Sequence, residues 1–328
     1  MIPISRKLTK FALTLGCIAA SIGADPVARA AYPERPILMT VPTAPGGTVD
    51  IVGRILAEQI GATLGQPIVV NNKPGAGGIV GTQAAKREQH DGYNLLFTAN
   101  SNQLIVPWVY KNPGFDPLRD FVPIAAVGLV PNVLCVHPSF PAKNLKEFIA
   151  VVKSHPDAYQ YASAGSGTLN HLLGVMLREK GGLKLQHVAY KGVSPAMADV
   201  LGNQVPMLFA SLPSALEAVK AGKLRAIGVS SVKRVPLLPG VAAIGEEIPG
   251  FSGDLWVALY APRGTPQSVI DKLYAAVKTA TSSPALQQRF DQLGVTLLLD
   301  GPQQLAQRQE RELLLWREVV KEAGATLD

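Results

Sequence analysis

The sequence predicts an α/β protein whose largely parallel sheets are arranged in two lobes. Buried-strand and helix patterns alternate almost to the end of the chain, as in proteins built from successive strand–helix units. Residues 37–81 contain two strand–glycine turn–helix units in a row. A chain of 328 residues can bury its own core, and its length favours two lobes over one.

The first 30 residues have the pattern of a secretory signal peptide. A positively charged region and an apolar stretch over residues 11–22 precede Ala28-Arg29-Ala30, an A-x-A cleavage site. Lipidation at Cys17 is the alternative, but Thr14 stands where a lipoprotein signal has Leu. We therefore expect export, with residues 1–30 removed after Ala30.

The composition bears on the partner, on disulfide formation and on metal binding. The formal net charge is +7, much of it in the expected signal peptide, and no basic run with interleaved aromatic residues predicts a nucleic-acid partner. A mildly positive balance favours an anionic small molecule. Cys135 is the one cysteine left after cleavage, so an intramolecular disulfide is excluded. The five histidines lack metal-site spacing, and we expect neither metal nor cofactor.

The elements follow one another in a regular order. The first helix has Val52, Leu56, Ile60 and Leu64 at i+4 spacing, which predicts a buried stripe. Strands are expected at 37–41, 67–70, 94–98, 133–136, 159–162, 184–187, 204–209 and 226–229. Helices are expected to begin at 48 and after 78, and to span 145–153, 169–179, 195–201, 214–221, 266–279 and 302–323.

No low-complexity linker divides the chain, so we expect it to cross between the lobes more than once. The candidate crossings are near Pro131-Asn132 and near Pro249-Gly250. One lobe would then contain residues 31–131 plus 251–328, and the other residues 132–250. Ligands of open α/β sheets bind at the carboxyl ends of the strands, so the cleft between the lobes is the expected site.

The two glycine turns within residues 37–81 point helix N-termini at one edge of a sheet. Their bare backbone N–H groups can hold an anion there. The second turn, residues 75–81, resembles a dinucleotide fingerprint, but its third glycine falls one place late. The strand that follows also ends without an acidic residue to bind a ribose. A tight strand-to-helix turn, rather than a cofactor site, is therefore predicted.

A further glycine turn, residues 162–168, also follows a strand and precedes a helix. A nucleophile elbow around Ser166 would need glycine where the chain has Ala164 and Thr168. The hydroxyls of Ser166 and Thr168 can instead bind a carboxylate or cap the helix. Ligand binding and helix capping both stay open, and covalent catalysis is disfavoured.

Three titratable residues allow two interpretations each. His171, one turn into the helix after this loop, is a candidate ligand contact, although a packing role is equally compatible. Asp50 could bind a ligand amine, but an acidic residue at that position more often stabilises the helix N-terminus. Lys191, at the end of another strand–turn–helix unit, could attract an anion or remain solvated.

Several motifs in fixed order resemble one family across essentially the whole chain after the signal peptide. They are YPERPI at residues 32–37, VPTAPGGTVDIVGRILAEQIGATLGQPIVVNNKPGAGG at 41–78, HDGY at 90–93, YASAGSGT at 161–168, YKGVSPAMADVLGNQV at 190–205, LPSALEAVKAGKLRAIGV at 212–229 and APRGTP at 261–266. The chain resembles the Bug family, the TctC-type periplasmic receptors of tripartite tricarboxylate transporters.

The resemblance implies a type II periplasmic binding protein fold, with two α/β lobes that close on a carboxylate, and it implies membrane transporter components as partners. It places ligand contacts on four loops: on Thr43, Ala44, Gly46, Gly47 and Thr48; on Asn100, Ser101 and Asn102; on Ala164, Gly165, Ser166, Gly167 and Thr168; and on Ala210 and Ser211.

Several positions depart from the family pattern, among them residues 240–243, where members usually have an acidic Pro-Thr segment. Members commonly have an aromatic residue where this chain has Thr43, Asn where it has Ser166, and an Asp-Asn pair where it has Ala210-Ser211. The missing acidic group weakens the case for an amino-acid ligand, whose ammonium group needs a carboxylate partner.

The expected function is therefore a non-enzymatic, monomeric periplasmic receptor for a small organic carboxylate, mono- or dicarboxylate and possibly aromatic in class. A ligand-presenting subunit for a membrane sensor kinase is the alternative, and a periplasmic serine hydrolase is the disfavoured one.

Overall fold

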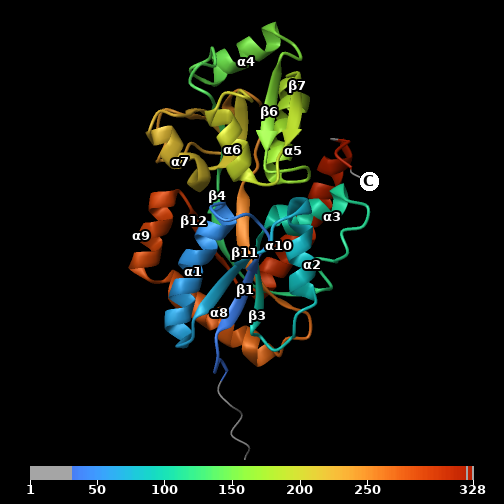
Figure 1. The fold of residues 1–328 in the computed structure, drawn as a ribbon, viewed down its shortest axis with the longest axis vertical. Coiled ribbons are helices and arrows are strands. Elements are labelled where there is room, and N and C mark those ends of the chain that lie inside the picture. Colours follow the sequence, from blue (N-terminus) through green and yellow to red (C-terminus); the bar gives the residue numbers. More distant parts are fainter. Residues whose placement is uncertain (1–31, 323, 327–328) are drawn as a thin grey trace, which may run out of the picture.

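The computed structural model describes residues 32–322 and 324–326. The expected signal peptide, Cys17 and the cleavage site after Ala30 lie outside these residues. Two lobes are stacked along the long axis of the molecule, each built around its own sheet (Figure 1). The α/β class and the two-lobed arrangement predicted from the sequence are confirmed.

Lobe 1 contains a six-stranded sheet, the helices around it and two short helical turns. Its strands are β1 Ile37–Val41, β2 Ile68–Asn72, β3 Asn94–Ala99, β4 Phe121–Val130, β11 Leu255–Pro262 and β12 Thr296–Asp300. Its helices are α1 Thr48–Leu64, α2 Ile79–Lys86, α3 Val106–Val109, α8 Gln267–Thr281, α9 Pro284–Leu293 and α10 Pro302–Glu322, with a 3₁₀ turn η1 at Ala76–Gly78 and a π-turn η2 at Ser101–Ile105.

Lobe 2 contains the second six-stranded sheet. Its strands are β5 Asn132–Val136, β6 Tyr159–Ser163, β7 Leu185–Ala189, β8 Met207–Ser211, β9 Arg225–Val229 and the short β10 Ala242–Ala243. Its helices are α4 Leu145–Ser154, α5 Leu169–Gly181, α6 Val193–Leu201, α7 Leu212–Lys220 and the 3₁₀ turn η3 Ile244–Glu246.

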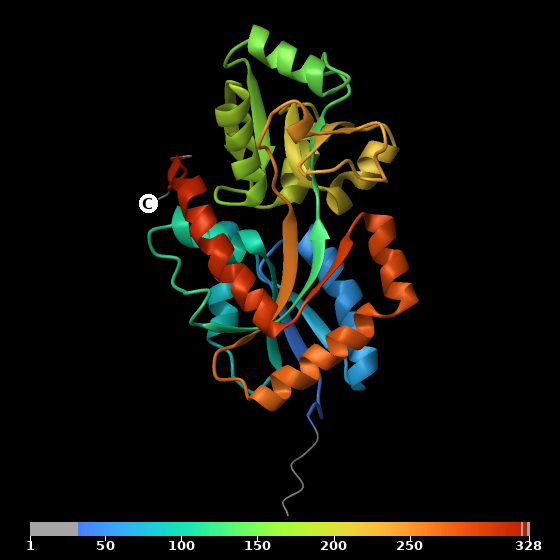
Figure 2. The ribbon, with the colours of Figure 1, turned by 180° about the vertical axis from the view of Figure 1, so that it is seen from behind.

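The strand order in lobe 1 is β12-β4-β11-β3-β1-β2, and in lobe 2 it is β10-β9-β5-β8-β6-β7. The chain moves from β1 to β2 through α1 and then back past β1 to β3 through α2. Because such crossovers are right-handed, reversing the direction of travel places α1 and α2 on opposite faces of the sheet. In lobe 1, α1, α8 and α9 pack together, while α2, α3 and α10 lie on the other side (Figures 1 and 2).

The chain passes from one sheet to the other between Val130 and Asn132, and returns between Ala243 and Leu255. The strands at these passages, β4 and β11, lie side by side (Figure 2); β4 runs toward lobe 2 and β11 runs back from it. The returning strand β11 is antiparallel to both neighbours, and β5 is likewise antiparallel to β8 and β9.

The expectation of largely parallel sheets was therefore wrong, because both sheets are mixed. The physical reason is the direction of the crossings. A strand that enters a sheet at the edge where its neighbours end must run against them, and β5 and β11 both enter in this way. The expected strand at 204–209 also begins later, at Met207, after the proline at 206, which has no N–H to give to a ladder.

Two buried apolar clusters stabilise this arrangement. The larger contains residues of both lobes, for example Phe97 of β3 and Phe209 of β8, and so continues through the crossing strands. The smaller lies within lobe 2, where the faces of β5 and β8 meet α6 and α7. The stripe predicted on α1 is confirmed for Val52, Leu56 and Ile60, which are fully buried.

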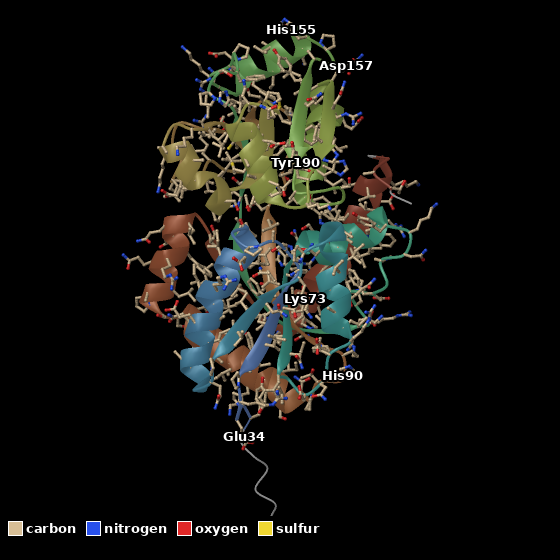
Figure 3. The ribbon with its side chains drawn as sticks, viewed as in Figure 1. Glu34, Lys73, His90, His155, Asp157 and Tyr190 are labelled. Atoms are coloured by element: carbon tan, nitrogen blue, oxygen red, sulfur yellow. The ribbon has the colours of Figure 1, made fainter. Side chains whose placement is uncertain are left out.

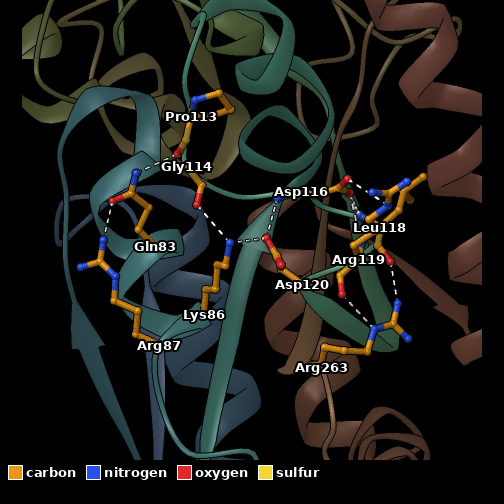
Figure 4. A network of polar contacts seen from close by, with 10 residues as sticks. All are labelled: Gln83, Lys86, Arg87, Pro113, Gly114, Asp116, Leu118, Arg119, Asp120 and Arg263. Carbon is orange, nitrogen blue, oxygen red and sulfur yellow. Dashed lines mark hydrogen bonds and ion pairs between the residues drawn. The ribbon is translucent and has the colours of Figure 1, made fainter.

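A polar network fixes the connection that leads into β4 (Figure 4). Lys86 of α2 forms an ion pair of 2.8 Å with Asp120, and the backbone N–H of Asp116 donates to the same carboxylate at 2.6 Å. Arg263, which follows β11, donates to the carbonyl oxygens of Leu118 and Arg119 at 2.6 and 2.9 Å. The segment before β4 and the segment after β11 are thereby joined at the end of lobe 1 that is distant from lobe 2.

Candidate functional site

Six strands end at the boundary between the lobes and lead directly into helices or helical turns: β1, β2 and β3 from lobe 1, and β6, β7 and β8 from lobe 2. Side chains of both lobes fill the region between them (Figure 3). A cavity of about 690 Å³ lies at this boundary. Its lining comprises residues 42–44, 47–49, 74–78, 99, 101, 102, 110, 132, 164–166, 168, 170, 189–194, 211 and 255.

The loop before α1 is held by a buried carboxylate. Gly46 adopts φ +79°, and its N–H donates to Asp50 Oδ2 at 2.9 Å. Arg54 Nε donates to Asp50 Oδ1 at 2.9 Å, and Asn72 Nδ2 donates to the same oxygen at 3.0 Å. Asn72 Nδ2 also donates to the Thr43 carbonyl oxygen at 3.1 Å, so both ends of the loop are fixed.

Asp50 is ionised, and its two oxygens accept hydrogen bonds from the loop, from α1 and from β2. Burial raises the pKa of its carboxyl, but the hydrogen bonds from Arg54, Gly46 and Asn72 outweigh burial and leave that pKa below its usual value. Asp50 is 4% exposed and does not line the cavity. Of the two interpretations of this residue, the geometry favours stabilisation of the loop and helix over binding of a ligand amine.

The loop before α5 performs the same task with neutral groups. Gly165 and Gly167 have φ +127° and +77°, values that suit glycine and let the backbone turn tightly. Thr168 Oγ1 donates to the Gly165 carbonyl oxygen at 2.6 Å and accepts from the N–H of His171, which makes it the N-cap of α5. Ser166 makes no hydrogen bond through its hydroxyl to the described residues and lines the cavity. Of the two roles that the sequence left open, Thr168 performs helix capping, and Ser166 is positioned for ligand binding.

His171 is directed at its own loop. Its Nδ1 accepts from the N–H of Gly167 at 3.2 Å, and its ring stacks on His187 with centroids 4.0 Å apart. His187 Nε2 lies 2.6 Å from Ser163 Oγ. Burial, then the neighbouring His187 and Arg178, lower the pKa of His171 to about 3, and burial lowers that of His187 to about 4. Both rings are therefore neutral near pH 7, and His171 does not line the cavity.

The two lobes touch around the cavity. Thr48 Oγ1 forms hydrogen bonds with Ser211 Oγ and, at 3.1 Å, with Ser214 Oγ. Two glycines allow close approach of backbone elsewhere on the rim. A Cβ placed on Gly77 would lie 3.4 Å from the Ser166 carbonyl oxygen, and one on Gly192 would lie 3.3 Å from Ala44 Cβ. The described structure is thus a closed arrangement of the lobes.

The lining carries little formal charge. It includes no acidic residue, and Lys191, an exposed residue, is its charged member. Tyr190 is engaged, because its hydroxyl donates to Asp199 Oδ2 at 2.6 Å. Four helices begin in the lining or directly after it, at Thr48, Leu169, Val193 and Leu212. Each helix N-terminus carries partial positive charge and free N–H groups, so the wall favours an anion.

The structure brings together most of the residues predicted to contact a ligand. The lining contains Thr43, Ala44, Gly47, Thr48, Ser101, Asn102, Ala164, Gly165, Ser166, Thr168 and Ser211. The remaining predicted residues do not line it: Gly46, Asn100, Gly167, His171 and Ala210. Asn100, for example, accepts from the N–H of Trp256 and donates to the Asp254 carbonyl oxygen, both on the returning segment.

The predicted ligand contacts leave out several lining residues: Tyr110, Asn132, Asn170 and residues 74–78, although the sequence does predict that this glycine turn can hold an anion. Two of these could have been found from the sequence. The turn follows a predicted strand that reaches the same sheet edge, and Asn132 stands at a predicted crossing between the lobes. Tyr110 and Asn170 reach the cavity through tertiary packing and carried no local signal.

The described residues contain no group of three His, Cys, Asp or Glu side chains that could hold a metal ion. Among residues 32–322 and 324–326, no helix is long and apolar enough to cross a membrane. Ser166 has no hydrogen-bonded histidine beside it, since the Nδ1 atom of His171 is engaged by Gly167. The arrangement can bind and enclose an anion but lacks an activated nucleophile at Ser166.

Comparison with known proteins gives consistent results. Residues 52–325 match the tripartite tricarboxylate transporter family receptor, TctC. Protein BugT of Bordetella pertussis is 35% identical over 323 residues, covering 98% of this chain and 99% of BugT.

Two solved structures are similar over most of the chain. The periplasmic binding protein BugD is 40% identical with a TM-score of 0.86, covering 90% of this chain and 99% of BugD. MatC of Rhodopseudomonas palustris, with bound malate, is 31% identical with a TM-score of 0.82, covering 88% of this chain and 100% of MatC. These similarities confirm the two-lobed periplasmic binding protein fold, and the chain belongs to the TctC, or Bug, family of tripartite tricarboxylate transporter receptors.

Proposed function

We propose that this protein is a periplasmic receptor that binds a small organic carboxylate between its lobes and presents it to the membrane components of a tripartite tricarboxylate transporter. One observation carries the proposal. Four helix N-termini, from both lobes, meet a cavity whose lining has hydroxyl and amide groups but no acidic residue. The malate bound by the similar MatC protein supports an organic acid as the ligand class.

The strength of such a site suits a transport receptor. A hydrogen bond to a charged group contributes roughly 1.5–3 kcal/mol, and a helix N-terminus adds about 0.3–1 kcal/mol. Four such bonds and two helix ends offset the cost of association and leave about 8 kcal/mol, which corresponds to micromolar binding. The lining residues Thr43, Thr48, Ser101 and Ser166 are the side chains we expect to contact the ligand, while His171 and Asn100 hold their loops.

The test is a thermal-shift screen over mono-, di- and aromatic carboxylates, each paired with its uncharged amide, followed by calorimetry on the acids that respond. At least one acid should raise the melting temperature in a concentration-dependent manner while its amide does not. If amides stabilise the protein and none of the acids does, the proposal is wrong.

We further propose that binding closes the lobes about the passages near residues 131 and 250, which would divide the chain into 31–131 plus 251–328 and 132–250. The two passages are adjacent, because Leu255 at the start of β11 pairs with Val130 at the end of β4, as a hinge requires. Small-angle scattering should give a smaller radius of gyration with saturating acid than without it. The same radius in both states would count against a hinge.

A further inference from the structure

The side-chain amide of Asn132 lines the cavity with one atom unused. Asn132 is the first residue of β5 and is 0% exposed, yet its Nδ2 has no hydrogen-bond partner among the described residues. A buried donor without a partner is costly and uncommon, and it is often explained by a group that binds there. Thr43 Oγ1, in the lining contributed by lobe 1, is likewise buried and unpartnered.

The remaining polar atoms of Asn132 are all engaged and hold the residue in place. Its N–H donates to Ser230 Oγ at 2.9 Å, and its carbonyl oxygen accepts from the Ser230 N–H at 2.8 Å. Its Oδ1 accepts from Asn170 Nδ2 at 2.9 Å. With the backbone and Oδ1 both fixed, the direction of Nδ2 is fixed as well.

The strand pairing places Asn132 beside another residue of the cavity lining. Asn132 is paired with Ser211 across the antiparallel strands β5 and β8, and residues directly opposite each other project on the same face. Ser211 lines the cavity and touches Thr48 at the start of α1. Asn132 Nδ2 therefore belongs to the same wall as the helix end that we expect to hold a carboxylate.

The donors of this wall outnumber what one carboxylate can accept. A carboxylate offers about four lone-pair sites, whereas the lining combines four helix N-termini with the unpartnered groups of Asn132 and Thr43. The surplus fits a ligand with a second oxygen function.

We propose that Asn132 Nδ2 donates a hydrogen bond to an oxygen of the bound ligand, and that the protein selects acids carrying a second carboxylate or a hydroxyl over plain monocarboxylates. This rests on the proposed carboxylate-binding function. Asn132 is then a specificity-determining residue. It is the first residue of β5, directly after the chain passes from lobe 1 to lobe 2.

The test is calorimetry on the full mature protein with succinate, malate and adipate, and with butyrate and hexanoate as monocarboxylates of matched chain length. The parent should bind at least one of the first three about tenfold or more tightly than its matched monocarboxylate. Asn132→Leu should weaken that binding about ten- to hundredfold and leave monocarboxylate affinity within about twofold.

Two further variants keep the test decisive. Asn132→Asp retains an acceptor for Asn170, and therefore the local fold, but has no donor and adds negative charge, so its loss of affinity should exceed that of Asn132→Leu. Gln309→Leu is the matched control, because Gln309 is also a buried amide with an unpartnered Nε2 but lies in α10, outside the lining. It should leave affinity unchanged.

The outcomes separate the two proposals. If the parent binds monocarboxylates as tightly as the other acids, or if Asn132→Leu and Asn132→Asp bind as the parent does, this inference fails while carboxylate binding stands. If the parent binds no acid of any class, the proposed function fails, and this inference falls with it.

Discussion

The loops before α1 and α5 face the cavity from opposite lobes and solve the same problem with different chemistry. Each is a glycine turn between a strand and a helix, and in each a glycine N–H donates to a side chain of the following helix. The lobe 1 loop is held by the ionised carboxylate of Asp50, whereas the lobe 2 loop is held by the neutral imidazole of His171. The lobe 1 loop thus depends on an ionised carboxylate and the lobe 2 loop on an uncharged imidazole. Mutations and pH should therefore change stability and ligand affinity differently in the two loops.

The largest effect should come from placing a charge in the lobe 2 loop. Ser166→Asp sets a carboxylate about 4 Å from the ligand anion, and at an effective dielectric of ~20 that repulsion is about 4 kcal/mol, on the order of a thousandfold in affinity. Because Ser166 makes no hydrogen bond in the fold, stability should change by less than about 0.5 kcal/mol. Calorimetry and urea unfolding on one preparation measure both.

Ser166→Ala is the control for this substitution. A receptor loses at most one hydrogen bond, roughly tenfold in affinity, whereas a hydrolase would lose all turnover. Undiminished binding by Ser166→Asp would mean that this loop lies outside the ligand site.

Removing the charge from the lobe 1 loop should act mainly on stability. Asp50→Ala leaves the Gly46 N–H, Asn72 and Arg54 without their shared acceptor, and we expect a loss of about 1–3 kcal/mol in the free energy of unfolding. Asp50→Asn, which retains one acceptor oxygen, should lose less. A variant with parental stability that no longer binds its acid would instead identify Asp50 as a ligand contact.

The matching change in the lobe 2 loop should be milder. His171→Phe preserves an aromatic ring against His187 but removes the acceptor for the Gly167 N–H, so about 1 kcal/mol of stability should be lost. His171→Asn supplies an oxygen near the position of Nδ1 and should recover part of that loss. Equal unfolding midpoints for the parent and His171→Phe would remove His171 from any role in the loop.

The sharpest comparison is in the pH dependence of stability. The pKa values of His171 and His187 are lowered on folding, to about 3 and about 4, so the unfolded chain binds more protons below pH 6.5. Stability contributed by the pair therefore falls as pH drops from about 6.5 toward 4. Asp50, whose folded pKa is also lowered, contributes stability that is lost only below its ordinary value near 3.8.

Unfolding measured by urea at several pH values between 4 and 7 separates the two. His171→Phe should have a shallower decline over this range than the parent, while Asp50→Asn should keep the parental slope. A parental slope in His171→Phe would place the titrating groups elsewhere.

The strands that the sequence predicted are those with local apolar runs, such as β1 and β6. The predicted strands leave out β4 and β11, although both are apolar runs, because their place in the sheet depends on the pairing of β11 with β4 and β3 across more than a hundred residues of chain. Their antiparallel direction follows from the crossings and has no local pattern. The loops of the site were predictable because glycine and hydroxyl residues mark strand ends. The orientation of His171 was not, because it depends on His187 of the neighbouring strand.

The close approaches at the rim of the cavity suggest how this receptor can be tuned. Gly77 and Gly192 line the cavity from opposite lobes, and neither has a side chain that could donate to a ligand. Bulk at the rim would change the fraction of closed molecules, and apparent affinity for every ligand scales with that fraction. The ratio between ligands would stay as the interior sets it. A substitution at one of these glycines should therefore change the ligand concentration at which the receptor responds without changing its preference among ligands.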